Sequence, residues 1–197
     1  MICKYSFSQQ PNQQDYKVFA AVIKSEIAER DKSIVLIKKS IGDKEFREGT
    51  SLTLVHLESG DISSMNEVNL WTSDSVGNRP TKMDSSSRKD ILDYCLESQN
   101  QFSFQDQFKL DLPVYFLKKL PIRKKTIDQD WKKFYSRYPG SAGIMSFSGI
   151  LYAQDSSKAI IYYWIRRNGL NGHGAIAIFE NTSGNWKLCF KTYLWWN

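Results

Sequence analysis

The chain has 197 residues and a formal net charge of +6, with 41% hydrophobic and 24% charged residues. These fractions lie near globular averages and argue against an intrinsically disordered or fibrous protein. No apolar stretch approaches the ~20 residues that a membrane helix needs, so we expect a soluble chain without a membrane span. The length predicts one α+β domain at residues 15–197 after a mobile polar leader at residues 1–14. The leader lacks the order of a signal peptide, and both a cytoplasmic and an exported location stay open.

The three cysteines, Cys3, Cys95 and Cys189, are widely separated and form no CxxC or Cys/His pattern. The sequence therefore predicts no metal site and no cofactor. Free thiols are the default expectation, and a single bridge between Cys95 and Cys189 stays open.

Residues 14–29 predict an amphipathic helix, because Tyr16, Phe19 and Ile27 recur at three- and four-residue steps together with Val22 or Ile23. We expect Asp15 to be its N-cap. The charged side chains expected to face water are Lys17, Lys24, Glu26 and Arg30.

The middle of the chain alternates between short apolar runs and polar segments. Residues 33–39 predict a strand, whereas residues 51–57, which contain His56, fit either a strand or a short helix. Residues 60–87 predict a long surface loop, and residues 88–97 predict a second helix. A further strand is expected at residues 114–117, and the preceding Pro113 favours an edge position or the start of a strand over a central position.

Residues 118–137 carry a net charge equal to that of the whole chain, since eight cations face only Asp128 and Asp130. Such a patch attracts phosphate backbones or anionic surfaces, although charge runs are more often solvated loops and helix faces. No nucleic-acid-binding motif accompanies it, so nucleic acid is an unlikely partner. Asp130 is expected to cap a short helix that turns Trp131, Phe134 and Tyr135 inward. The patch consists of Lys118, Lys119, Arg123, Lys124, Lys125, Lys132, Lys133 and Arg137.

The last third predicts antiparallel strands: a strand at 143–152, bent near Gly149, and then three strands at 159–167, 175–180 and 185–196. The bulky residues on both faces of the second of these place it inside the sheet. The turn at 168–174 joins strand to strand, so it is no phosphate-binding loop, which needs a following helix. Simple alternation places Trp186, Leu188, Phe190 and Leu194 on one face of the last strand, and Lys187, Cys189, Lys191, Tyr193 and Trp195 on the other.

Residues 131–197 resemble the ending of a family of uncharacterised bacterial proteins. The resemblance rests on the pattern W-x-x-FY-x-x-YP-x-S-x-G, followed by a strand, G-x-x-G-x-G, G-x-W and a terminal Trp. It is carried by residues 131–135, 138–143, 146–149, 169–174 and 184–186. The resemblance implies no activity, and members of that family often look exported. Many relatives carry cysteines in the glycine turn, where this chain has Asn171 and His173, so no disulfide is implied there.

The expected fold is therefore α+β, with two or three helices packed on one curved antiparallel sheet, and with cystatin-like and nuclear-transport-factor-like folds as analogies. The chain has six Trp, ten Tyr and eleven Phe, which fit an aromatic core or a ligand-binding face. The leading hypothesis is a non-catalytic module that binds an unknown protein or small molecule on an aromatic-rich sheet face. Its candidate residues are Tyr163, Asn171, His173, Tyr193 and Trp195.

Two other hypotheses stay open. The first is a small hydrolase-like enzyme that uses His173 or His56 with Asp155 or a nearby serine, and His173 is its best catalytic candidate. The second is a weak nucleic-acid binder that uses residues 118–137.

Overall fold

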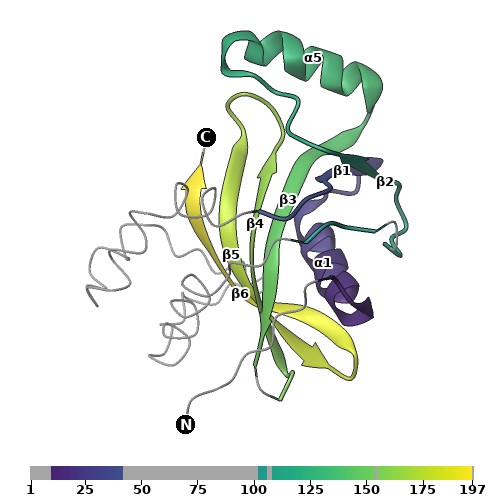
Figure 1. Ribbon diagram of the computed structural model, residues 1–197, viewed down its shortest axis with the longest axis vertical. Helices are drawn as coiled ribbons and strands as arrows, with labels where there is room; N and C mark the ends of the chain where they lie inside the picture. The colour runs from purple at the N-terminus through teal and green to yellow at the C-terminus, as the bar shows by residue number, and fades with distance from the viewer. Residues whose placement is uncertain (1–9, 42–101, 106–107, 154, 197) are drawn as a thin grey trace, which may run out of the picture.

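The structure is a computed structural model, and it describes residues 10–41, 102–105, 108–153 and 155–196 (Figure 1). Two α-helices pack with a six-stranded, mostly antiparallel sheet that does not close, so the predicted α+β class is confirmed. The predictions for His56, Cys95, the loop at 60–87 and the helix at 88–97 fall outside the described residues. The cystatin-like and nuclear-transport-factor-like analogies stay predictions.

The first helix, α1 (Gln13–Glu26), begins inside the segment predicted as a leader. Its N-cap is Asn12, whose side chain accepts hydrogen bonds from the backbone nitrogens of Gln14 (2.7 Å) and Asp15 (3.1 Å). Asp15 is thus not the cap. It lies in the first turn, where its carboxylate accepts a hydrogen bond from the Asn12 backbone nitrogen at 2.8 Å. This second hydrogen bond completes a capping box.

The sheet has the strand order β2-β1-β3-β4-β5-β6. Its strands are β1 (Ser33–Ile37), β2 (Val114–Leu117), β3 (Ser141–Tyr152), β4 (Lys158–Arg166), β5 (Gly172–Thr182) and β6 (Asn185–Trp196). The last four form an antiparallel meander, with β4 inside the sheet as predicted. By contrast, β1 is parallel to both β2 and β3. The expectation of a wholly antiparallel sheet is therefore wrong at this end.

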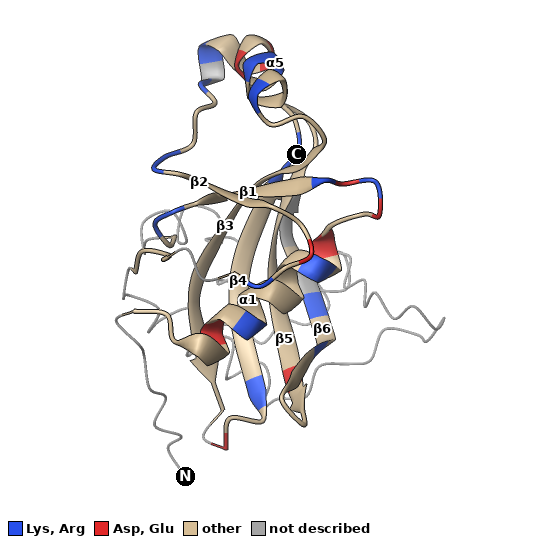
Figure 2. Ribbon diagram, turned by 90° about the vertical axis from the view of Figure 1, so that its right-hand side faces the viewer, with Lys and Arg blue, Asp and Glu red and all other residues tan. Residues whose placement is uncertain are grey.

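One face of the sheet is covered by α1, which lies across it in Figures 1 and 2. The core between them is aromatic. The Phe19 ring of α1 lies 5.0 Å from both Phe104 and Phe147, measured between ring centroids. Tyr163 of β4 is completely buried in the same cluster. Many of the aromatic residues in the described parts of the chain therefore build the core.

The second helix, α5 (Ile127–Arg137), follows the 3-10 helix η1 (Lys124–Thr126) and packs on the opposite face of the sheet. Trp131 and Phe134 point inward, as predicted, and contact Val35 and Ile144. Asp130 does not cap this helix, which already begins at Ile127. Its carboxylate instead accepts hydrogen bonds from Arg123 and Thr126, which lie just before the helix.

The faces of β6 differ from simple alternation, because the register between β5 and β6 shifts by one residue at Cys189. This extra residue is a β-bulge, which transfers the following side chains to the other face. Lys191 and Tyr193 therefore share the face towards α1 with Trp186 and Leu188. The prediction that placed Lys191 and Tyr193 on the opposite face from Trp186 and Leu188 is wrong. Cys189 itself is a free, exposed thiol.

Gly143 provides a test of the close contact between β3 and β4. Its φ is +128°, and a Cβ atom there would lie 2.3 Å from the carbonyl oxygen of Arg166. We expect Gly143→Ala to lower the free energy of unfolding by more than about 2 kcal/mol, measured by urea denaturation.

The matched control is Gly149→Ala on the same strand. Gly149 lies at the register shift between Phe147 and Ile150, and a Cβ atom there would meet nothing within 4 Å. Its free energy of unfolding should change by less than about 0.5 kcal/mol. Equal effects of the two substitutions would contradict the described backbone.

Candidate functional site

A cluster of buried polar side chains surrounds Glu26, the last residue of α1, whose side chain is almost inaccessible to solvent. The hydroxyl of Tyr163 donates a hydrogen bond to Glu26 Oε1 at 2.6 Å, and Lys191 Nζ donates to the same oxygen at 2.9 Å. The Nε2 atom of His173 lies 3.1 Å from Glu26 Oε2. We call Glu26, Tyr163, His173, Lys191 and Tyr193 the Glu26 cluster.

Tyr193 closes this cluster on β6. Its ring lies edge-on to the His173 ring, with 4.9 Å between centroids, and Lys191 Nζ lies 5.2 Å from the centroid of the same ring. The aromatic face thus contributes to holding the ammonium group in place.

The electrostatics of the cluster are dominated by burial and by the carboxylate. Burial alone would raise the pKa of Glu26, but the hydrogen bond with His173, the charges of Lys191 and His173, and the hydrogen bond from Tyr163 together lower it to about 2. Burial lowers the pKa of Lys191, yet the charge of Glu26 and the hydrogen bond with it, together with Tyr193, outweigh burial and raise that pKa above its ordinary value. Burial and Glu26 raise the pKa of Tyr163 well above its ordinary value, so this phenol remains a hydrogen-bond donor.

Arg167, in the turn after β4, supports the same end of α1. Its Nη2 donates to the backbone carbonyl of Glu26 at 2.6 Å, and its Nη1 donates to the carbonyl of Ala142 at 3.3 Å. It also lies 3.8 Å from the Asp31 carboxylate. A cation at the C-terminal end of a helix binds the free carbonyls there and is favoured by the helix dipole. Arg167 fills this role for α1, whereas the dipole disfavours the carboxylate of Glu26 at the same end.

The cluster has the composition of a general base, because a carboxylate faces an imidazole. However, Tyr163 is 0% exposed, Lys191 5% and His173 7%, and their contacts with Glu26 join α1 to three strands. The arrangement holds a helix on a sheet, and substrate access to it is narrow. No group of three His, Cys, Asp or Glu side chains in the described parts of the chain could hold a metal ion.

Asp155, the predicted catalytic partner, is not near His173. It precedes the first residue of β4, and its carboxylate accepts hydrogen bonds from the backbone and hydroxyl of Ser157. His173 instead pairs with Ile165 at the far end of the strand. Seven residue steps of β4 separate its first residue, Lys158, from Ile165, which at ~3.3 Å for each step is roughly 23 Å.

The structure brings together three of the five predicted binding residues, namely Tyr163, His173 and Tyr193, but beneath α1 and not on an open face. His173 belongs to β5 and not to the glycine turn. That strand begins at Gly172, where a Cβ atom would lie 2.9 Å from the Ile165 carbonyl. Asn171 is exposed in the turn, where its carbonyl accepts a hydrogen bond from the Arg167 nitrogen at 2.7 Å. The side chain of Trp195 lies outside the described ones.

Sequence reasoning missed Glu26, which it placed in water, and it missed the pairing of Glu26 with Lys191. One signal for Glu26 was available, because the buried stripe of Tyr16, Phe19 and Ile23 continues to position 26 at the same spacing. Lys191 is 165 positions away in the sequence, and no local pattern predicts that contact.

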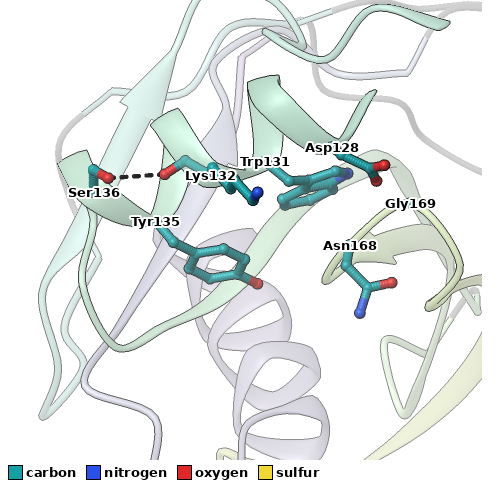
Figure 3. Close-up of a pocket in the computed structure, with 7 residues that line it drawn as sticks. All are labelled: Asp128, Trp131, Lys132, Tyr135, Ser136, Asn168 and Gly169. Carbon is teal, nitrogen blue, oxygen red and sulfur yellow. Dashed lines mark hydrogen bonds between the residues drawn. The ribbon is translucent and has the colours of Figure 1, made fainter. Parts of the chain in front are cut away.

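A pocket lies between α5 and the turn that joins β4 to β5 (Figure 3). Its volume is about 820 Å³, and we call it the α5 pocket. The rings of Trp131 and Tyr135 stack on the helix side, with centroids 5.7 Å apart. The Tyr135 hydroxyl donates a hydrogen bond to the Arg167 carbonyl, which fixes the turn against the helix. The lining residues are Asp128, Trp131, Lys132, Tyr135, Ser136, Asn168 and Gly169.

The predicted basic patch follows the connector from β2 and continues onto α5, where Figure 2 colours Lys and Arg blue. The charge of Arg123 is neutralised by Asp130. The guanidinium and backbone nitrogen of Arg123 donate hydrogen bonds to the Asp130 carboxylate at 3.0 to 3.1 Å. These hydrogen bonds, with one from Thr126, hold the pKa of Asp130 well below its ordinary value. The side chain of Lys124 lies outside the described ones. The other exposed cations of the patch are Lys118, Lys119, Lys125, Lys132, Lys133 and Arg137.

Comparisons with known protein families, curated proteins and solved structures found no match to this chain. The resemblance of residues 131–197 to uncharacterised bacterial proteins therefore stays a prediction. No helix in the described parts of the chain has the length and apolar character needed to cross a membrane.

The Glu26 cluster predicts a dependence of stability on pH. The pKa of Glu26 falls from 4.5 to about 2 on folding, which corresponds to about 3 kcal/mol at about 1.4 kcal/mol for each pKa unit. Because the folded pKa is the lower one, this stabilisation is present above the unfolded pKa and is lost as the pH falls towards 2. The difference in free energy of unfolding between the native protein and Glu26→Gln should shrink by about 3 kcal/mol between pH 6 and pH 2.

Urea denaturation at each pH measures this difference. Glu180→Gln, which removes an exposed carboxylate from β5, serves as the control and should show only a small change. A difference for Glu26→Gln that stays constant over this range would show that Glu26 is not stabilised as a carboxylate.

Proposed function

We infer that the protein is a non-catalytic binding module and that its ligand site is the α5 pocket. The observation that supports this best is an open pocket of about 820 Å³ with exposed charged and amide side chains around buried and half-buried rings. The Glu26 cluster, in contrast, directs its charges at one another. The sheet face proposed from the sequence lies under α1 at Tyr163, so the proposed site moves to the other side of the sheet.

The chemistry of the lining favours a small polar ligand with an acidic group. Lys132 offers an exposed ammonium group to that acid, while Asp128 and Asn168 offer hydrogen-bond acceptors and donors to neighbouring polar atoms. Trp131 and Tyr135 provide the apolar wall that small-molecule sites usually combine with a few polar groups. Figure 3 shows Asp128 and Trp131 on the helix side, across the pocket from Asn168.

The two walls of the pocket are held together before any ligand binds. Tyr135 bonds to the Arg167 carbonyl, and the position of a Cβ atom at Gly169 would lie 3.2 Å from Ile127 of α5. A prearranged site loses less conformational entropy when a ligand binds. This supports binding of a small molecule without rearrangement of the fold.

A catalytic role for His173 is the second candidate, and its support is the 3.1 Å approach of His173 to Glu26. It is the weaker proposal because the pair is nearly covered and Asp155 lies at the other end of β4. Binding of nucleic acid is weaker still, since Asp130 neutralises Arg123 and Asp128 lies within the same patch.

A panel of citrate, inorganic phosphate and glucose 6-phosphate, with glucose as the neutral match, tests the proposed site. Amide shifts of ¹⁵N-labelled protein should change at residues 131–136 and 168–169 with an acidic member of the panel. The melting temperature should rise with the same compound, because a ligand that binds only the folded state stabilises it. Lys132→Ala should weaken that binding about tenfold, whereas Lys133→Ala, whose exposed side chain is not part of the lining, should leave it unchanged.

Binding that persists in Lys132→Ala, or glucose binding as well as its phosphate, would contradict an acid-binding pocket. The absence of shifts at these residues with every compound would contradict the assignment of the ligand site.

A further inference from the structure

The strand β2 is one open edge of the sheet, because among the described residues it pairs with β1 alone. The pairing is parallel, and it turns the carbonyls of Pro113 and Leu117 towards β1, where they accept from Ile34 and Lys38 at 3.1 and 2.7 Å. Alternate residues of a parallel strand bond to the same neighbour, so the backbone groups of Val114 and Phe116 face the open edge. No hydrogen bond joins them to another described residue.

A groove of about 690 Å³ follows this edge, and we call it the β2 groove. Phe108, Leu112 and Phe116 form an apolar floor that continues from the core. Tyr115 is 44% exposed, which is unusual for a large hydrophobic residue in the described parts of this chain. The complete lining is Lys38, Phe108, Leu112, Pro113, Val114, Tyr115, Phe116 and Lys118.

The charges around the β2 groove are almost all positive. Lys38 and Lys118 line the groove. Three more exposed lysines directly follow lining residues in the sequence: Lys39 follows Lys38, Lys109 follows Phe108, and Lys119 follows Lys118. Among the described residues of these stretches, only Asp111 opposes the five lysines. Lysines on an exposed edge strand discourage pairing between two copies of the same chain, because like charges would meet. The same lysines favour an acidic partner strand.

We propose that the β2 groove binds an extended acidic segment of a partner protein as a seventh strand. The backbone groups of Val114 and Phe116 would pair with the segment, and its alternate apolar side chains would lie over Phe108 and Phe116. Acidic side chains between them would reach Lys38 and Lys118. This surface is separate from the α5 pocket, so either proposal can fail without the other.

The probe is a seven-residue peptide in which glutamate alternates with valine, capped at both ends and labelled with a fluorophore. Two matched peptides accompany it: one with lysine in place of glutamate, and one with every residue N-methylated, which removes the backbone donors on both edges. We expect the acidic peptide alone to bind at concentrations up to about 1 mM and to weaken as salt is added. Its amide shift changes should centre on residues 114–118, and the Phe116 amide should gain protection from hydrogen exchange.

Charge-reversal variants separate this groove from general attraction to a basic protein. Lys38→Glu with Lys118→Glu should weaken binding about tenfold or more, and Lys132→Glu with Lys133→Glu should leave it within about twofold. Both pairs change the same number of exposed charges, and none of the four side chains is buried, so both variants should fold. Circular dichroism and the native amide spectrum check this.

Three results would overturn the proposal. They are the absence of acidic-peptide binding at about 1 mM, shift changes that centre on α5 with equal weakening by both charge-reversal pairs, and undiminished binding of the N-methylated peptide. The last result would show that the groove is occupied without pairing of a strand.

Discussion

The carboxylate of Glu26 is the constraint on which the rest of the described structure depends. It lies at the C-terminal end of α1, where the helix dipole disfavours negative charge, and it faces a core built mainly of apolar side chains. A buried carboxylate is tolerated only when it is paired and hydrogen-bonded. Tyr163, His173 and Lys191 supply those partners from β4, β5 and β6, so a single side chain sets how α1 lies across three strands.

This constraint also accounts for local irregularities. The β-bulge at Cys189 brings Lys191 to the face of the sheet on which Glu26 lies, and Arg167 caps the same helix end from the following turn. Because the Arg167 carbonyl accepts from Tyr135, the cap is connected to α5 on the opposite face. The charged groups under α1 therefore serve the fold, and the exposed surfaces suited to partners are the α5 pocket and the β2 groove.

The sequence predicted what local patterns determine. The strand at 114–117, its edge position, the inward turn of Trp131 and the interior place of β4 all follow from periodicity and from Pro113. It could not predict the parallel pairing of β1, because the partners β2 and β3 are distant from β1 in the sequence and no local pattern indicates the direction of pairing. Alternation also failed after Cys189, because one inserted residue reverses the faces of Lys191 and Tyr193, before the register shifts again between Tyr193 and Trp195. Glu26 was missed because a charged residue at the end of a helix is usually exposed.

A double-mutant cycle between Glu26 and Lys191 tests the central claim most directly. Glu26→Gln, Lys191→Met and the double variant are compared with the native protein in free energy of unfolding at pH 7. If the pair holds α1 on the sheet, each single change leaves a partner unsatisfied, and the double variant should recover about 1 to 3 kcal/mol relative to the sum of the two. Additive effects would contradict the claim, since they would show that Glu26 and Lys191 contribute to stability independently.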